Sequence, residues 1–132
     1  MGDIRFAIEL KVRDYELDAQ GVVNNAVYLH YLEHCRHEFL LSRGIDFNRY
    51  AREGIDLVVV RCELDYKAPL RGGDAFRVTL ALERLSPLRF VFLQEIRRQG
   101  DDRLVLAART IGTALNAKGR PFLPPEMERL LS

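Results

Sequence analysis

The segment DAQGVVNNAVYLHYLEHCRHEFLLSRG, residues 18–44, decides how this chain folds. Its first part is polar and contains Gly21, as expected of a loop. From Asn25 to about Arg43 the apolar residues recur with helical spacing, and Gly44 follows as a suitable terminating residue. The segment therefore predicts a loop that leads into one long helix.

The apolar residues also predict which face of this helix is buried. At about 100° per residue, they form one stripe with two flanks: Tyr28, Leu32, Cys35 and Phe39, with Leu29 and Leu40 on one side and Tyr31 on the other. Histidines and glutamates lie opposite, on a solvated or partner-facing side: His30, Glu33, His34, His37 and Glu38. Arg36 is the exception, because it projects beside the apolar stripe, where a guanidinium group needs a partner. Three interpretations stay open: Arg36 reaches the rim of the core, pairs with a carboxylate such as Asp18, or contacts an acidic substrate group.

Strand patterns surround this helix. Apolar and polar residues alternate over 4–13 before it and, after a turn-rich piece at 45–54, over 58–67 and 76–82. Two further strands are predicted at 90–97 and 104–115. The last of these is apolar at nearly every position, which is typical of a central strand. Short turns join these strands, and Pro124-Pro125 predicts the start of a short final helix that ends at Leu131. The order predicts an α+β fold in which a long central helix is wrapped by a curved, mostly antiparallel five-stranded sheet. Because part of this sheet remains open, we expect at least a dimer.

Composition excludes several functions. The 132 residues suit one domain, and the formal net charge of +1 comes from scattered charges that do not indicate a nucleic-acid partner. The N-terminus has no signal-peptide pattern, and no apolar run is long enough for a membrane span. Cys35 and Cys62 form no CxxC pair, so we expect reduced thiols in a cytoplasmic protein.

One short motif suggests a metal. His30-Tyr31-Leu32-Glu33-His34 matches the HxxEH pattern of some zinc peptidases, with His37 close by. However, these residues lie on the polar helix face, and a peptidase cleft is hard to build in so small a chain. We therefore expect a surface histidine cluster, no metal and no cofactor.

Asp18 is the strongest candidate for chemistry. It lies a few residues before the predicted helix, whose free backbone N–H groups can hold a developing oxyanion, while a carboxylate can act as base or nucleophile. Gly21 allows the backbone to approach a ligand closely, and Asn24 and Asn25 stand at the N-cap with amides that can donate to a substrate carbonyl. Glu16, two residues earlier, is the competing carboxylate.

These residues also carry a family resemblance. The segment 12–44, with Asp18-x-x-Gly21-x-Val23 and Tyr28, resembles the 4-hydroxybenzoyl-CoA thioesterase-like branch of the hotdog superfamily. Residues 14–18, 21–28 and 36–40 look similar to plant acyl-ACP thioesterases of the acyl-lipid type. Residues 68–74, APLRGGD, resemble the strand-turn signature of the family.

The resemblance implies one hotdog thioesterase domain over residues 1–132, without cofactor, assembled as a dimer or a tetramer of dimers with sites at the dimer interface. Asp18 falls at the position of the catalytic carboxylate. The backbone N–H of Asn25 falls where relatives polarise the thioester carbonyl, and many relatives carry His or Tyr at that position. The expected reaction is hydrolysis of an acyl-CoA or acyl-ACP thioester to acid and thiol, with Arg36 as a third catalytic candidate.

Substrate contacts are expected from Gly21, Asn24 and Tyr28, although packing is the better interpretation of Tyr28. The carrier's phosphates favour exposed basic residues at turns and strand ends: Arg71, Arg84, Arg89 and Arg120. Two alternatives remain. A non-catalytic acyl-thioester binding module would not need Asp18, and a hotdog dehydratase would need a histidine with its carboxylate, whereas all three histidines lie on the polar helix face.

Overall fold

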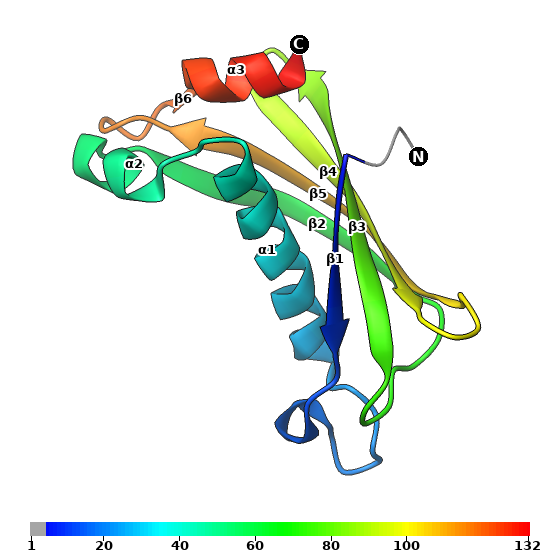
Figure 1. The fold of residues 1–132 in the computed structure, drawn as a ribbon. Coiled ribbons are helices and arrows are strands. Elements are labelled where there is room, and N and C mark those ends of the chain that lie inside the picture. Colours follow the sequence, from blue (N-terminus) through cyan, green and yellow to red (C-terminus); the bar gives the residue numbers. More distant parts are fainter. Residues whose placement is uncertain (1–4) are drawn as a thin grey trace.

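The computed structural model describes residues 5–132, in which a curved antiparallel sheet partly encloses one long helix (Figure 1). The elements follow the chain in this order: β1 (Phe6–Lys11), the 3-10 turn η1 (Asp14–Glu16), α1 (Asn25–Ser42), α2 (Phe47–Glu53), β2 (Asp56–Tyr66), β3 (Ala75–Ser86), β4 (Arg89–Arg98), β5 (Leu104–Leu115), β6 (Pro121–Phe122) and α3 (Pro125–Leu131). The predicted helix, the five predicted strands and the short last helix are therefore confirmed. Ile4, predicted as the start of the first strand, lies outside the described residues.

The strands are ordered β1-β3-β4-β5-β2, and every ladder is antiparallel. β5 is an inner strand, as its continuous apolar pattern predicts, and it also pairs with β6. β6 was not predicted, because two residues cannot show an alternating pattern. β1 and β2 form the edges of the main sheet, and β2 is a long edge of eleven residues.

α1 lies across the concave face of the sheet and supplies much of the core (Figure 1). Its buried residues follow the predicted stripe: Tyr28, Tyr31, Leu32, Cys35, Phe39 and Leu40. Leu29, predicted on the flank, is 41% exposed. The helix ends as expected, since Gly44 has a φ of +83°, a backbone conformation that favours glycine.

The segment between α1 and β2 contains a helix that we had predicted only as a turn-rich piece. Asp46 caps α2, its Oδ1 accepting from the backbone N–H of Arg49 at 3.0 Å, and Gly54 ends it with a φ of +71°. Tyr50 is buried, and its hydroxyl donates to Glu126 of α3 at 3.2 Å. Seven residues are too few for a periodic pattern, but the Asp46 and Gly54 pair is a signal that could have identified α2.

None of the helices in residues 5–132 has the length and apolar character required to span a bilayer.

Candidate active site

The Asp18 loop is a tight hairpin closed by its own backbone. The Asp18 N–H donates to the carbonyl of Val22 at 2.8 Å, and Leu17 pairs with Val23 in an antiparallel bridge. Gly21 turns the chain with a φ of +79°; an added Cβ there would meet no atom within 4 Å, so backbone conformation rather than space requires glycine. These backbone contacts hold the Asp18 loop in one conformation although it contains no helix and no regular strand.

The Asp18 carboxylate is exposed, and only one of its oxygens is engaged. Oδ1 accepts the backbone N–H groups of Gln20 at 2.8 Å and Val22 at 3.3 Å. Among residues 5–132, no group donates to Oδ2. The side chain is therefore held in position while one carboxylate oxygen faces solvent.

Glu16, the competing carboxylate, has structural partners. Its Oε1 accepts the backbone N–H of Arg13 at 2.8 Å and the hydroxyl of Tyr31 at 2.7 Å. Burial and the bond to Glu16 raise the pKa of Tyr31 well above its ordinary value, so this hydroxyl remains a donor. Glu16 thus ties the loop to α1, and Asp18 is the freer of the two carboxylates.

The N-terminus of α1 adjoins this hairpin. The Asn24 Oδ1 accepts the backbone N–H of Ala26 at 3.0 Å, and the Asn24 carbonyl accepts that of Val27 at 2.9 Å. The Asn24 side chain is thus a helix cap on an exposed residue. Within the described residues the Asn25 N–H has no acceptor, as is usual for the first turn of a helix. This N–H is the donor predicted for an oxyanion.

Tyr28 lies beneath the loop. It is buried, its hydroxyl accepts the Leu70 N–H at 3.1 Å, and its ring packs edge-on against Tyr66 with centroids 5.6 Å apart. The Tyr66 hydroxyl in turn donates to the carbonyl of Asn25 at 3.3 Å. Tyr28 therefore positions the loop and helix end, in agreement with the packing interpretation.

Of the four basic residues predicted to hold a carrier's phosphates, Arg71 and Arg89 lie far apart in one chain. Val22 pairs with Arg71 in an isolated bridge, so Arg71 is beside the Asp18 loop. Arg89 begins β4, at the end of the sheet opposite that loop (Figure 1). Arg71 is the one that the fold brings to the candidate site.

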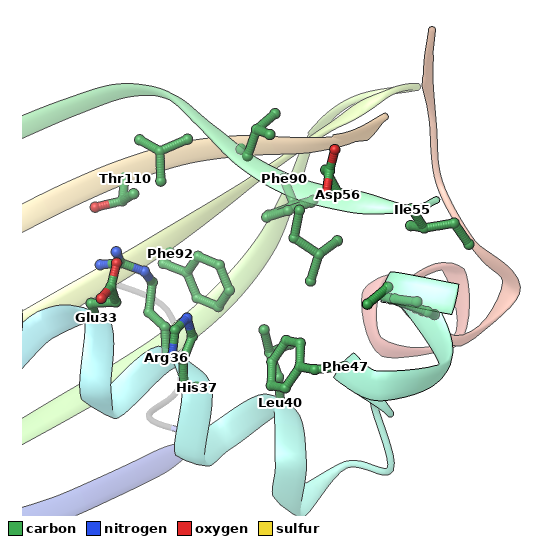
Figure 2. Close-up of a pocket in the computed structure, with 16 residues that line it drawn as sticks. Glu33, Arg36, His37, Leu40, Phe47, Ile55, Asp56, Phe90, Phe92 and Thr110 are labelled. Carbon is green, nitrogen blue, oxygen red and sulfur yellow. The ribbon is translucent and has the colours of Figure 1, made fainter. Parts of the chain in front are cut away.

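A pocket of about 300 Å³ opens between the C-terminal half of α1, α2 and strands β2, β4 and β5 (Figure 2). Its walls are largely apolar, with contributions from Leu40, Phe47, Ile55, Phe90 and Phe92. Polar side chains of α1 also line it: Glu33, Arg36 and His37. Sequence reasoning missed most of this pocket, because α2 was not predicted and residues on four other elements form the remainder.

Arg36 points into this pocket rather than toward Asp18. Its Nη1 donates to Oε1 of Gln94 at 3.2 Å, and its guanidinium carbon lies 6.0 Å from the ring centroid of Phe92. Arg36 is eleven residues beyond Asn25, about 16 Å along the helix axis. Within one chain the structure thus does not bring Arg36 and Asp18 together.

The histidines remain on the exposed face of α1. Across residues 5–132, no three His, Cys, Asp or Glu side chains are grouped so that they could share a metal ion.

Gly112 of β5 gives the pocket a closely packed wall. A Cβ at this position would lie 2.8 Å from Cε1 of Phe90 and 2.9 Å from the carbonyl oxygen of Val58. We expect Gly112→Ala to lower the free energy of unfolding by about 1–3 kcal/mol, because the Val58 backbone on β2 must move. Urea denaturation measures this loss. Gly72→Ala is the control: its Cβ would meet only the end of the Leu17 side chain, at 3.1 Å, and an equal loss in both variants would contradict the steric explanation.

Comparison with known proteins places this chain in a family. A family model described as the thioesterase-like superfamily matches residues 12–131. The chain belongs to this superfamily. A chloroplastic acyl-acyl carrier protein thioesterase of Arabidopsis thaliana is 43% identical over 122 residues, covering 92% of this chain and 64% of the plant protein. This member of the superfamily thus spans less than two thirds of that relative's length.

A further curated protein and a solved structure are also similar to this chain. A long-chain acyl-CoA thioesterase of Escherichia coli strain K12 is 29% identical over 120 residues, covering 91% of this chain and 90% of that protein. The crystal structure of a 1,4-dihydroxy-2-naphthoyl-CoA thioesterase from Synechocystis superposes with a TM-score of 0.89 at 22% identity, covering 96% of this chain and 94% of that one. The structural similarity confirms the predicted hotdog fold of this superfamily member.

Proposed function

We propose that this protein hydrolyses acyl thioesters carried by coenzyme A or by acyl carrier protein. One observation supports the proposal above all: a carboxylate oxygen of Asp18 and the backbone N–H of Asn25 are both without a protein partner in the described chain, and they flank one short loop. The names of the relatives support the same reaction class.

In the proposed reaction, the thioester carbonyl oxygen accepts the Asn25 N–H, and the positive end of the α1 dipole stabilises the negative charge that develops there. Asp18 either takes a proton from a water molecule that attacks the carbonyl carbon, or attacks that carbon itself to give a mixed anhydride that water then cleaves. In both routes the carbon–sulfur bond breaks and the thiolate leaves. A thiolate is a good leaving group, so the site does not need a histidine as general acid.

Arg71 is the proposed contact for a phosphate of the carrier. It is exposed and adjoins the Asp18 loop through the bridge to Val22. Its backbone N–H donates to the Asp74 carboxylate at 2.9 Å, and no carboxylate of residues 5–132 forms a salt bridge with its guanidinium group. Arg89 serves this site only if a second copy brings it there.

We further propose that the protein assembles through β2 as a dimer, or as a tetramer of such dimers. β2 is an edge strand of eleven residues that pairs with β5 on one side and, within the described chain, with no strand on the other. Val59 and Val60 on it are 55% and 43% exposed, and long exposed edge strands tend to pair with another strand. Light scattering coupled to gel filtration is expected to give two or four times the chain mass. A fully active monomer at assay concentration would contradict this assembly.

We also propose that the protein works in a reducing compartment such as the cytoplasm. Both cysteines are free thiols, and Cys62 is exposed. A reducing compartment such as the cytoplasm suits this state.

Thiol release tests the proposed activity. Purified full-length protein is assayed with short, long, aromatic and β-ketoacyl CoA thioesters, and with acyl-ACP in parallel. We expect turnover with at least one of them, and the best substrate identifies the acyl class. Absence of turnover on both carriers, with tight acyl-CoA binding retained, would instead identify a non-catalytic binding module.

A further inference from the structure

Arg36 presents a guanidinium group with unused hydrogen-bond donors to a pocket whose walls are largely apolar. Figure 2 shows its side chain rising from α1 between Glu33 and Phe92, on the same side of the pocket as Thr110. A guanidinium group has five N–H donors. Among residues 5–132 it makes one hydrogen bond to the protein, to Gln94, and no carboxylate lies within salt-bridge distance.

The single protein partner is neutral and fixed. Gln94 is fully buried, and its Nε2 donates to the carbonyl of Leu32 at 3.2 Å, so its Oε1 is directed at Arg36. The nearby Phe92 ring supports the guanidinium group from one side. These contacts hold the group in one orientation. Burial lowers the pKa of Arg36, and the charge of Glu33, one helical turn earlier, opposes this shift without forming a salt bridge.

A ligand that fills such a pocket must be apolar along most of its length and must offer an acceptor at Arg36. Leu40, Phe47 and Phe90 form walls suited to hydrocarbon or aromatic groups. The phosphate groups of the carrier are a poor match, because the walls are apolar and Glu33 adds a negative charge at the pocket.

We propose that this pocket binds the acyl group of the substrate, and that Arg36 selects acyl groups bearing an oxygen acceptor, such as an oxo, hydroxyl or carboxylate substituent. The inference rests on the proposed thioesterase function and specifies its substrate class. A buried donor left without an acceptor disfavours plain acyl chains, which is how a polar group in a pocket produces specificity.

The test compares matched pairs of CoA thioesters that differ only in the oxygen. The pairs are plain and 3-oxo acyl chains, plain chains and chains with a terminal carboxylate, and benzoyl and hydroxybenzoyl groups. For the wild type, kcat/KM of the oxygenated member is expected to exceed that of the plain member by about 10-fold or more in at least one pair. The preferred position of the oxygen then reports how far Arg36 lies from the reacting carbonyl in the assembled enzyme.

Two variants and a control assign the preference to Arg36. Arg36→Met, which keeps an apolar chain but removes every donor, is expected to reduce the ratio to about 2-fold or less. Arg36→Lys keeps the charge but loses the planar fork, so it should retain part of a carboxylate preference. Arg52→Met removes an exposed arginine of α2 that does not line the pocket, and it should keep the wild-type ratio.

Binding measurements separate this proposal from the proposed function. Dissociation constants of the same pairs are measured by calorimetry on Asp18→Asn and on Asp18→Asn combined with Arg36→Met. If no thioester is hydrolysed, the proposed function fails, but the ratio of these constants still decides the role of Arg36. A preference that survives Arg36→Met, or its absence from every pair in the wild type, would overturn the inference. An unchanged ratio together with loss of the oligomer would assign Arg36 to the contact between copies.

Discussion

Asp18→Asn is expected to lower kcat for thioester hydrolysis by at least about 100-fold, comparable to the loss of an oxyanion-hole donor. Asparagine has nearly the same shape, and its amide oxygen can still accept the N–H groups of Gln20 and Val22, so the hairpin should remain folded. It can neither take a proton from water nor attack the thioester. Steady-state thiol release on the best substrate of the panel, with the melting temperature recorded beside it, measures the effect.

Two neighbouring carboxylates provide the controls. Asp14→Asn removes an exposed carboxylate that starts the turn η1, and it should leave kcat within about 2-fold of the wild type. Glu16→Gln tests the competing residue: it should reduce stability through the contacts to Arg13 and Tyr31 more than it reduces turnover. If Glu16→Gln abolished turnover while Asp18→Asn kept it, the site assignment would be wrong.

Phe39→Ala is expected to reduce the free energy of unfolding by about 3–5 kcal/mol. Phe39 is completely buried at the junction of α1 and the sheet, with its ring edge-on to Phe6 at 5.7 Å and to Phe92 at 6.5 Å. Truncation leaves a cavity between these rings, which the curved sheet can close only in part. Urea denaturation monitored by circular dichroism gives the change in unfolding free energy.

Leu41→Ala is the matched control for this measurement. Leu41 is on the same helix, two residues further along the chain, but its side chain is 53% exposed. Its replacement should change the unfolding free energy by no more than about 0.5 kcal/mol. Equal effects at the two positions would show that helix propensity, and not burial against the sheet, governs the stability of α1.

The long helix and the long strands could be predicted because their apolar residues recur several times at one fixed spacing. α1 shows the spacing 28, 32, 35, 39, and its buried residues follow that stripe. The strands show alternation over several residues, and the short turns between them imply the antiparallel order. α2 and β6 escaped prediction because seven and two residues hold too little of any period.

In the candidate site, the features that depend on residues close together in the sequence could be predicted, whereas contacts between distant residues could not. The hairpin around Asp18, the Asn24 cap and the start of α1 at Asn25 depend on residues within a few positions of one another. Arg36 shows the opposite case, because its partner Gln94 is 58 residues away and meets it only after β4 has taken its place in the sheet.

The sequence by itself therefore determined the long helix, the antiparallel strands and the loop that presents Asp18, because short-range periodicity, turn chemistry and capping specify these features. Only the tertiary structure decided which carboxylate is free, which arginine adjoins the loop, and where Arg36 points. Glu16 is engaged by Tyr31 of α1, and Arg71 reaches the loop through Val22. These contacts join segments that are distant along the chain, so they depend on how the helix crosses the sheet and on the strand register, which no local pattern specifies.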